Sequence, residues 1–408
     1  MPEEEEIEAP VTHRLEPQIS STHRTVSSDH ALREHILSQS KLWEWDVFKL
    51  EEVSGRKPLM HLAYYLIQRK NFFQIFQIPS GTLKNFLIAI EAGYQMDVPY
   101  HNSTHATDVL QAVSYFLEKE KMQGQITDLE ILASYIAAAV HDHKHPGVNN
   151  QFLVATRNER AMLYNDRSVL ENYHVSTAWQ VMMQPENNFL VNLPEEDYRL
   201  LRNQVISMVL ATDLAGHFST LSAFNNKVLG TNTFDINQSP EDRAIFFRIL
   251  IKCADVSNPA RSWLVYTSWI ERLIQEFLNQ GDEERKRGLP VSPLMDRSSI
   301  NIPAGQIGFI DVVCAPMYES FTMVVGAPEM VTSMKKNRAI LMRMRDNEIP
   351  PLRLGENGRV IQRVRSTIRI AGSTTPPVQP TSSSLLQVSA ISVLARPAED
   401  SASKGSTE

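Results

Sequence analysis

The sequence predicts an all-α fold, and three observations support that prediction. Apolar residues recur every three or four positions through most of the chain between residues 33 and 345. Alternating strand patterns joined by Asn-Gly or Asp-Gly turns are scarce, and no glycine-rich phosphate loop follows a strand. The chain has 408 residues, 42% of them hydrophobic, which suffices for one large helical domain or two of ordinary size.

Helical spacing is clearest in four segments, in chain order 62–67, 87–92, 131–136 and 269–277. Each repeats apolar side chains at intervals of three or four, so that they fall on one helix face. These segments indicate a compact multi-helix domain over residues 33–350, and the sequence contains no internal repeat.

Composition sets this domain apart from both ends of the chain. Residues 1–32 mix Glu, Pro, Ser, Thr and His without a sustained apolar period, which predicts a mobile arm. Residues 351–408 are first basic and then rich in Ser, Thr and Pro, which predicts a disordered tail.

Positive charge concentrates between residues 335 and 369, where ten lysines and arginines stand against three acids. The favoured interpretation is a solvated helix end followed by a mobile linker. The alternative is a docking or membrane-surface element in the C-terminal tail, with Ser366 as the target of a regulatory kinase.

Charge and cysteine usage limit the cellular setting. A net charge of −7 gives no overall attraction to nucleic acid or to anionic membranes. Two cysteines do not form a disulfide framework, which favours a reducing compartment and a cytoplasmic location. The acidic N-terminus lacks the apolar stretch of a signal peptide, and the apolar runs are shorter than the about 20 residues that span a bilayer.

The residues that suggest chemistry are a dispersed set of histidines and acids. His101 and His105 are four residues apart, so on a helix they share a face. They could bind one metal together, divide the roles of ligand and acid, or be incidental. His141-Asp142 and Asp255 each follow an apolar helical segment, where a buried charge is costly unless it is paired or metal-bound. The set favours a two-metal hydrolytic centre bridged by a carboxylate.

Six stretches of the chain match a known pattern in its order: 100–109, 138–147, 164–174, 210–213, 253–259 and 306–311. The pattern resembles the HD-type metal-dependent phosphohydrolases, and within them the class I cyclic-nucleotide phosphodiesterases. The resemblance covers roughly residues 40–345 and implies the helical catalytic domain of that family.

The resemblance also implies roles for the histidines and acids. His101 would protonate the O3′ leaving group as general acid. The tighter metal, zinc, would be held by His105, His141, Asp142 and Asp255. Asp142 would also reach a second, more hydrated ion, magnesium or manganese. Metal-bound waters would be oriented by His145, Glu171 and Thr212, whose alternative is ordinary buried polar structure.

The same comparison implies a purine-binding pocket. Gln306 has both an amide donor and an acceptor, and Phe309 lies one helical turn further on, where it could stack on the base. The rest of the pocket would be Tyr100, Asn258, Tyr266, Trp269 and Phe277. Asn258 is similar to the residue of cAMP-selective members, so cAMP is expected over cGMP. Apart from the resemblance, these side chains are typical of core packing, or of a helix cap at Asn258.

One departure from the family pattern follows the His-Asp pair. The family usually has an apolar and then often an acidic residue there, whereas this chain has His143 and Lys144. An ammonium that faced the metals would repel them, whereas one that faced outward would cost little.

Three functions therefore remain open. The expected one is hydrolysis of a cyclic nucleotide to its 5′-monophosphate, and the second is HD-type hydrolysis of linear nucleotides. The third is a nucleotide-binding module whose second metal site is weakened by Lys144. A homodimer is common among members of the resembled family, but no interface can be recognised in the sequence.

Overall fold

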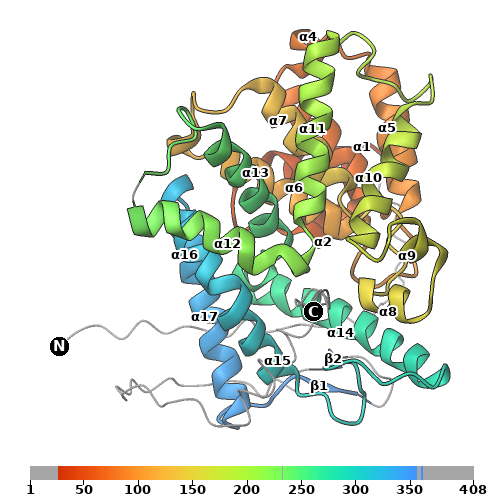
Figure 1. Ribbon diagram of the computed structural model, residues 1–408, viewed down its shortest axis with the longest axis vertical. Helices are drawn as coiled ribbons and strands as arrows, with labels where there is room; N and C mark the ends of the chain where they lie inside the picture. The colour runs from red at the N-terminus through yellow and green to blue at the C-terminus, as the bar shows by residue number, and fades with distance from the viewer. Residues whose placement is uncertain (1–25, 232, 356–359, 362–408) are drawn as a thin grey trace, which may run out of the picture.

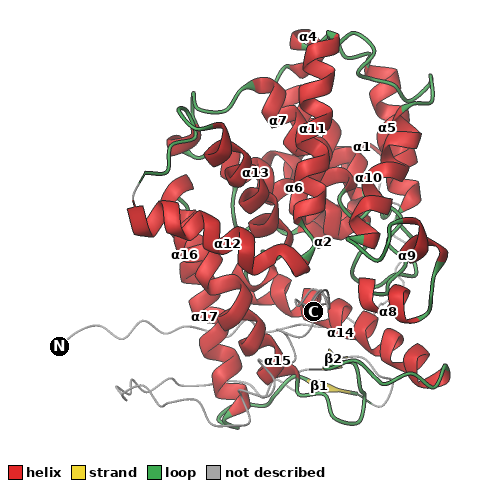
Figure 2. Ribbon diagram, in the orientation of Figure 1, coloured by secondary structure: helices red, strands yellow, loops and turns green. Residues whose placement is uncertain are grey.

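The computed structural model describes residues 26–231, 233–355 and 360–361 (Figure 1). Within these ranges the chain is helical almost throughout, which confirms the all-α prediction (Figure 2). The described chain forms one main apolar core, with a smaller apolar cluster beside it.

The first half of the described chain contains ten α-helices: α1 (Val26–Ser38), α2 (Val47–Val53), α3 (Pro58–Arg69), α4 (Phe72–Ile75), α5 (Ser80–Gly93), α6 (Ser103–Leu117), α7 (Asp128–Val140), α8 (Asn150–Ala155), α9 (Glu159–Leu163) and α10 (Val169–Met182). The second half contains seven more: α11 (Glu195–Ala211), α12 (His217–Asn225), α13 (Pro240–Asp255), α14 (Trp263–Lys286), α15 (Ile302–Phe309), α16 (Ala315–Val325) and α17 (Pro328–Arg345).

Short elements complete the described part of the chain. Four are 3₁₀ turns: η1 (Gln39–Lys41), η2 (Glu120–Met122), η3 (Leu214–Gly216) and η5 (Asn258–Ala260). Two are π-helical: η4 (Asn226–Thr231) and η6 (Ile310–Cys314). Two short strands, β1 (Arg353–Leu354) and β2 (Val360–Ile361), pair antiparallel.

Both expected domain boundaries differ from the element boundaries. Helix α1 begins at Val26, so the boundary expected at residue 33 falls inside a helix. Strands β1 and β2 follow the boundary expected at residue 350. The rest of the expected arm and tail, including Ser366, lies outside the described residues.

The described part of the basic segment is paired with acids at the surface. Arg338 bonds Asp311 with two guanidinium nitrogens, and Arg343 bonds Glu348. These exposed pairs fit the interpretation of a solvated helix end, in which each contributes little to stability.

Helix α7 is the buried centre of the fold and packs against α6 and α11 (Figure 1). It begins with a capping box, in which Thr127 and Glu130 each accept a backbone N–H of the other. Such a cap stabilises a helix start by about 1 kcal/mol. The side chains from Ile131 to Val140 are all buried, so the helix delivers the next residues, His141 and Asp142, to the interior.

Helices α6 and α13 pack against each other beside α7. Asn102 caps α6 by accepting the backbone N–H groups of Thr104 and His105, which fixes the first turn that contains His105. Helix α13 begins at the Ser239 cap with Pro240 as its first residue, and it ends at Asp255. The predicted metal ligands therefore lie at the start of α6, just after the end of α7, and at the end of α13.

One helical stretch departs from the expectation that no apolar segment is long enough for a bilayer. Residues 302–325, which span α15, η6 and α16, form 24 helical residues that pass the criteria of length and hydropathy for a membrane span. Half of the tested window is buried inside the fold, which is typical of a core helix.

At Gly281, helix α14 lies against the backbone of Met295, in the segment that precedes α15. A Cβ at this position would lie 2.0 Å from the carbonyl oxygen of Met295, a backbone atom that cannot rotate away. We expect Gly281→Ala to lower the free energy of unfolding by about 1–3 kcal/mol in denaturant titrations. Gly81→Ala is the matched control, because Gly81 lies in α5 with open space around it and alanine favours a helix by up to about 1 kcal/mol. Equal stability of the two variants would contradict this prediction.

Candidate active site

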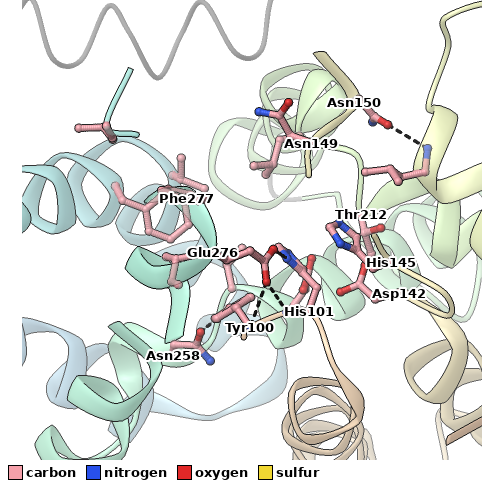
Figure 3. A pocket seen from close by; sticks show the side chains of 18 of the residues that line it. Tyr100, His101, Asp142, His145, Asn149, Asn150, Thr212, Asn258, Glu276 and Phe277 are labelled. Carbon is pink, nitrogen blue, oxygen red and sulfur yellow. Dashed lines mark hydrogen bonds and ion pairs between the residues drawn. The ribbon is translucent and has the colours of Figure 1, made fainter. Parts of the chain in front are cut away.

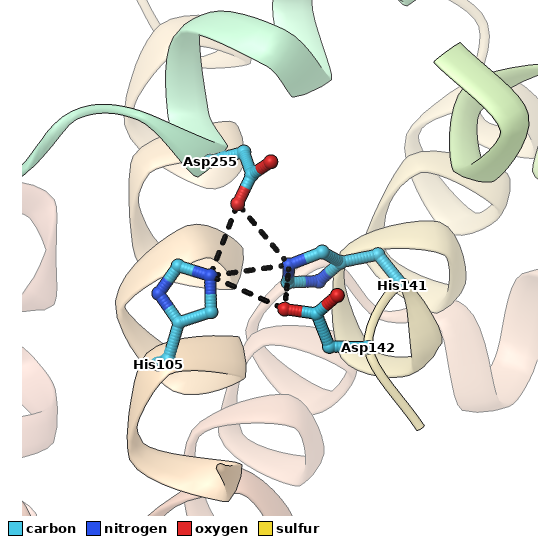
Figure 4. Close-up of side chains that lie close together, drawn as sticks. All are labelled: His105, His141, Asp142 and Asp255. Atoms are coloured by element: carbon cyan, nitrogen blue, oxygen red, sulfur yellow. Dashed lines mark hydrogen bonds and ion pairs between the residues drawn. The ribbon is translucent and has the colours of Figure 1, made fainter. Parts of the chain in front are cut away.

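Three buried side chains and the half-buried side chain of Asp255 converge on one point where three helices begin or end (Figure 4). His105 comes from α6, His141 and Asp142 follow α7, and Asp255 ends α13. The Nε2 atom of His105 lies 3.0 Å from Asp255 Oδ1 and 3.3 Å from His141 Nε2. His141 Nε2 also lies 3.1 Å from Asp142 Oδ2. One ligand atom from each residue lies within 4.8 Å of all the others, so the structure brings together the four predicted metal ligands.

The donor set suits a divalent ion such as zinc, which binds imidazole nitrogen and carboxylate oxygen. His141 Nδ1 lies 2.9 Å from the carbonyl oxygen of Ala138, so its Nε2 atom faces the cluster, where it would bind a metal ion after losing its proton. Burial opposes ionisation of Asp255, but hydrogen bonds from His105 and His141 hold its pKa well below the usual range. An ionised carboxylate beside imidazole nitrogens that a metal ion can deprotonate fits a metal site.

Asp142 has the geometry of a bridging carboxylate. Its Oδ2 atom faces His105 and His141, while Oδ1 lies 3.7 Å from Nε2 of His174 on α10. A second cluster of buried ligand atoms is formed by Asp142, His145 and His174. The two oxygens of one carboxylate therefore face two neighbouring groups of ligand atoms.

The predicted outer residues, His145, Glu171 and Thr212, all line one cavity. Glu171 and Thr212 line the same cavity as Asp142, beside Asp213. Burial and the charge of Asp213 raise the pKa of Glu171 to about 8. Thr212 donates its hydroxyl to the Val209 carbonyl at 2.8 Å, which leaves its oxygen free to accept from a bound water. Acids that repel one another in this way favour a nearby cation.

His101 lies beside the cluster and contacts a carboxylate that sequence reasoning missed. Its Nδ1 atom bonds Oε1 of Glu276 on α14, while Oε2 of Glu276 accepts the backbone N–H groups of Tyr100 and His101 at 2.9 and 3.1 Å (Figure 3). Burial opposes the imidazolium, but the charges of Glu276, Asp142 and Asp255 and the hydrogen bond to Glu276 together outweigh burial and raise the pKa of His101 to about 9. Burial also opposes ionisation of Glu276, but the charge of His101 lowers the pKa of this carboxyl to about 2. His101 is therefore a proton donor held by an ionised acid.

His101, His145 and Glu276 also have ligand atoms within 4.8 Å of one another. The rings of His101 and His145 stack at 4.0 Å with an interplanar angle of 20°. Stacked imidazoles direct their in-plane lone pairs along nearly parallel lines, so the two rings do not converge on one ion. This trio is better suited to holding a proton than to holding a metal.

The clusters open into one cavity of about 320 Å³ (Figure 3). The predicted substrate residues all line it: Tyr100, Asn258, Tyr266, Trp269, Phe277, Gln306 and Phe309. Tyr266 donates its hydroxyl to Oε1 of Gln306 at 2.9 Å, and Tyr100 donates to Oδ1 of Asn258. Helices α14 and α15 thus contribute aromatic and amide side chains to the cavity that His101 also lines.

Neither of the two residues that depart from the family pattern is among the described side chains of the metal cluster. The backbone of Lys144 is left-handed, with φ at 63°, and its half-buried side chain is not among the described residues that line the cavity. His143 is fully buried, with Nδ1 3.1 Å from the Thr177 hydroxyl and its ring against Gly93. Burial and the charge of Lys144 lower the pKa of His143 to about 3, so its ring is neutral.

Two functional groups escaped sequence reasoning. Glu276 stands beside Phe277, seven residues after Trp269, but nothing local marks it as the partner of His101. His174 lies in a stretch that matches the family pattern, although its sequence position does not indicate a role beside Asp142.

A helical domain with a buried cluster of histidines and aspartates at three helix ends has the character of an HD-type metal-dependent phosphohydrolase. Residues 100–336 match the family described as 3′5′-cyclic nucleotide phosphodiesterase. The chain therefore belongs to the 3′,5′-cyclic nucleotide phosphodiesterase family.

Curated relatives agree with this assignment. The chain is 39% identical over 311 residues to 3′,5′-cyclic-AMP phosphodiesterase 4C of Rattus norvegicus, a match that covers 74% of this chain and 58% of the relative. It is 40% identical over 295 residues to dual specificity calcium/calmodulin-dependent 3′,5′-cyclic nucleotide phosphodiesterase 1C of Mus musculus, covering 71% of this chain and 40% of the relative. The chain thus spans about half the length of these relatives.

Removal of one cluster carboxylate tests the metal site without an activity assay. We expect Asp255→Asn to weaken zinc binding by about 100-fold or more, because loss of a ligand exceeds the usual effect of losing an outer-shell contact. Metal content after dialysis against graded chelator, measured by mass spectrometry, gives the affinity. Asp311→Asn is the control, because that exposed acid pairs with Arg338 away from the cluster. Equal zinc retention by both variants would exclude Asp255 as a ligand.

Proposed function

We propose that the protein hydrolyses the 3′ phosphoester bond of a 3′,5′-cyclic nucleotide and releases the nucleoside 5′-monophosphate. The proposal rests mainly on one arrangement, in which a single cavity is lined by the two carboxylates of the four-residue cluster, by the His101 acid and by the Gln306–Phe309 pair. A phosphate at the cluster and a purine between α14 and α15 would place the scissile bond beside His101. Membership of the phosphodiesterase family supports the same reaction.

Zinc is the ion that we assign to His105, His141, Asp142 and Asp255. Magnesium or manganese is assigned to Asp142 as a shared ligand, in a cavity whose wall also includes the oxygen-bearing side chains of Glu171, Thr212 and Asp213. When bound, the two ions would lower the pKa of a water molecule and neutralise charge on the phosphate oxygens.

His101 supplies the proton that the leaving group needs. As the oxygen of a hydroxide, formed from water by loss of a proton to solvent, bonds to phosphorus, the P–O3′ bond breaks and O3′ takes the proton of His101 Nε2. Glu276 binds the opposite ring nitrogen, which orients the imidazolium and stabilises its charge before the proton leaves. The same carboxylate accepts the backbone N–H groups of residues 100 and 101, so it also positions the histidine's backbone.

Cyclic AMP is the substrate that we favour. The relatives do not decide the base, since one is named for cyclic AMP and another for dual specificity at similar identity. Asn258 lines the cavity and offers an amide oxygen that can accept from the exocyclic amine of adenine. Gln306 and Phe309 would bind the same base by an amide contact and by stacking.

Two alternatives have less support. A hydrolase of linear nucleotides has no need of a base pocket opposite the acid. A weakened binding module would require Lys144 to disturb the second metal, yet Lys144 is not among the described residues of the cavity wall.

A substrate panel tests the proposed function. Purified protein incubated with cAMP, cGMP and linear nucleotides, with and without magnesium, is expected to convert cAMP to AMP in a magnesium-dependent manner. His101→Ala should lower kcat by about 10²–10⁴-fold, because the alkoxide would leave unprotonated. Chromatography of the products measures both outcomes. Unchanged cAMP under every metal condition would exclude the proposal, and phosphate release from linear nucleotides would favour the alternative.

The pairing of His101 with Glu276 predicts a pH effect. Because Glu276 raises the pKa of His101, the imidazolium persists at neutral pH and is lost as pH rises through that pKa. Glu276→Gln keeps an acceptor for the two N–H groups but removes the charge. It should move the alkaline limb of the kcat profile to lower pH by about 1–3 units.

Glu271→Gln, on the same helix but outside the cavity wall, is the control and should leave that limb in place. An alkaline limb that is unchanged in Glu276→Gln would remove Glu276 from this role.

A further inference from the structure

The amide of Asn258 is bound from two sides by groups of different hydrogen-bonding character. The Tyr100 hydroxyl contacts Oδ1, and Oδ2 of Asp108 on α6 lies 3.3 Å from Nδ2. Asp108 is fully buried behind the cavity wall and is not among the described residues that line the cavity. Asp108 therefore contacts Asn258 on the side of the amide that faces away from the cavity.

An ionised carboxylate accepts hydrogen bonds and cannot donate them. Oδ1 of Asp108 lies 2.8 Å from the guanidinium of Arg261, which is also fully buried. Burial raises the pKa of Asp108, but the permanent positive charge of Arg261 opposes that rise. A neutral Asp108 would leave this guanidinium buried without a counter-charge, so the carboxylate stays ionised. The Asn258 atom that faces Asp108 must then be its nitrogen.

The Asp108–Arg261 pair is itself held rigidly. Arg261 donates to the backbone carbonyls of Trp43 and Asp108, both at 3.1 Å, and its guanidinium lies 4.2 Å from the centre of the Trp43 ring. The Trp43 indole donates to the Ala260 carbonyl at 2.7 Å. The η5 turn that contains Asn258 is thus joined to α6, the helix that carries Asp108, and to the segment around Trp43.

The orientation of the Gln306 amide is less restricted than that of the Asn258 amide. Its partner is the hydroxyl of Tyr266, and a hydroxyl can either donate or accept. Rotation of the Gln306 amide by 180° would therefore keep a hydrogen bond to Tyr266. The same rotation at Asn258 would place its amide oxygen against the Asp108 carboxylate. Of these two amides, only that of Asn258 has an orientation set by charge.

We propose that Asp108 is a positioning residue for base selectivity, because it fixes the Asn258 amide with its oxygen toward Tyr100 and its nitrogen toward the buried carboxylate. This inference rests on the proposed function. The fixed oxygen accepts from the 6-amino group of adenine but repels the 6-carbonyl oxygen of guanine. A freely rotating amide would serve both bases, so the Asp108 carboxylate makes the pocket favour cyclic AMP.

Asp108→Asn tests the proposal with little change of shape. The amide that this substitution introduces can donate as well as accept, so the Asn258 amide becomes free to turn. We expect the ratio of kcat/KM for cAMP to that for cGMP to fall by about tenfold or more. Asn337→Ala is the control, because Asn337 supports the same turn through the carbonyls of Pro259 and Arg261, both at 2.8 Å, without touching the Asn258 amide. It should lower thermal stability and leave the ratio unchanged.

A second measurement needs no variant and so remains decisive if Asp108→Asn does not fold. Cyclic inosine monophosphate has the 6-carbonyl of guanine without its 2-amino group, and the wild-type protein should discriminate against it as strongly as against cGMP. Efficient turnover of this analogue, or an unchanged ratio in folded Asp108→Asn, would overturn the role of Asp108 while leaving the phosphodiesterase activity intact. An equal fall of the ratio in Asn337→Ala would also overturn it. Absence of turnover of every cyclic nucleotide would instead overturn the proposed function.

Discussion

Burial of two imidazoles and two carboxylates within 4.8 Å of one another is the constraint on which the molecule depends. Such a concentration of polar groups is costly in a helical core unless a cation joins them. The helices that carry these groups are held by defined ends. Asn102 caps the start of α6, a capping box begins α7, and Asp255 is the last residue of α13. The helical scaffold therefore serves mainly to hold three helix ends at one point.

Helix α14 links the acid to the base pocket. Trp269 and Phe277 line the cavity, while Glu276 on the same helix binds His101 and the backbone before it. Proton donation and base binding thus share one rigid element, so a shift of α14 would affect both.

Much of this arrangement could be predicted from local sequence. Apolar periodicity indicates the helices, and the chemistry of His105, His141, Asp142 and Asp255 suggests a metal centre before any contact is known. The rest depends on contacts that no local pattern encodes. Glu276 lies 175 residues from His101 in the chain, and Asp108 lies 150 residues from Asn258. The left-handed backbone of Lys144 could not be predicted either, because lysine is not a residue that favours this conformation.

The contact between His143 and Gly93 limits the order in which this chain can change. A Cβ at position 93 would lie 2.0 Å from Nε2 of the buried His143 ring, at the end of α5. Any side chain at position 93 therefore requires a smaller residue at position 143 beforehand, whereas the reverse order passes through a clashing intermediate. The histidine beside Asp142 thus restricts a helix end 50 residues earlier in the sequence, and positions 93 and 143 are expected to vary together.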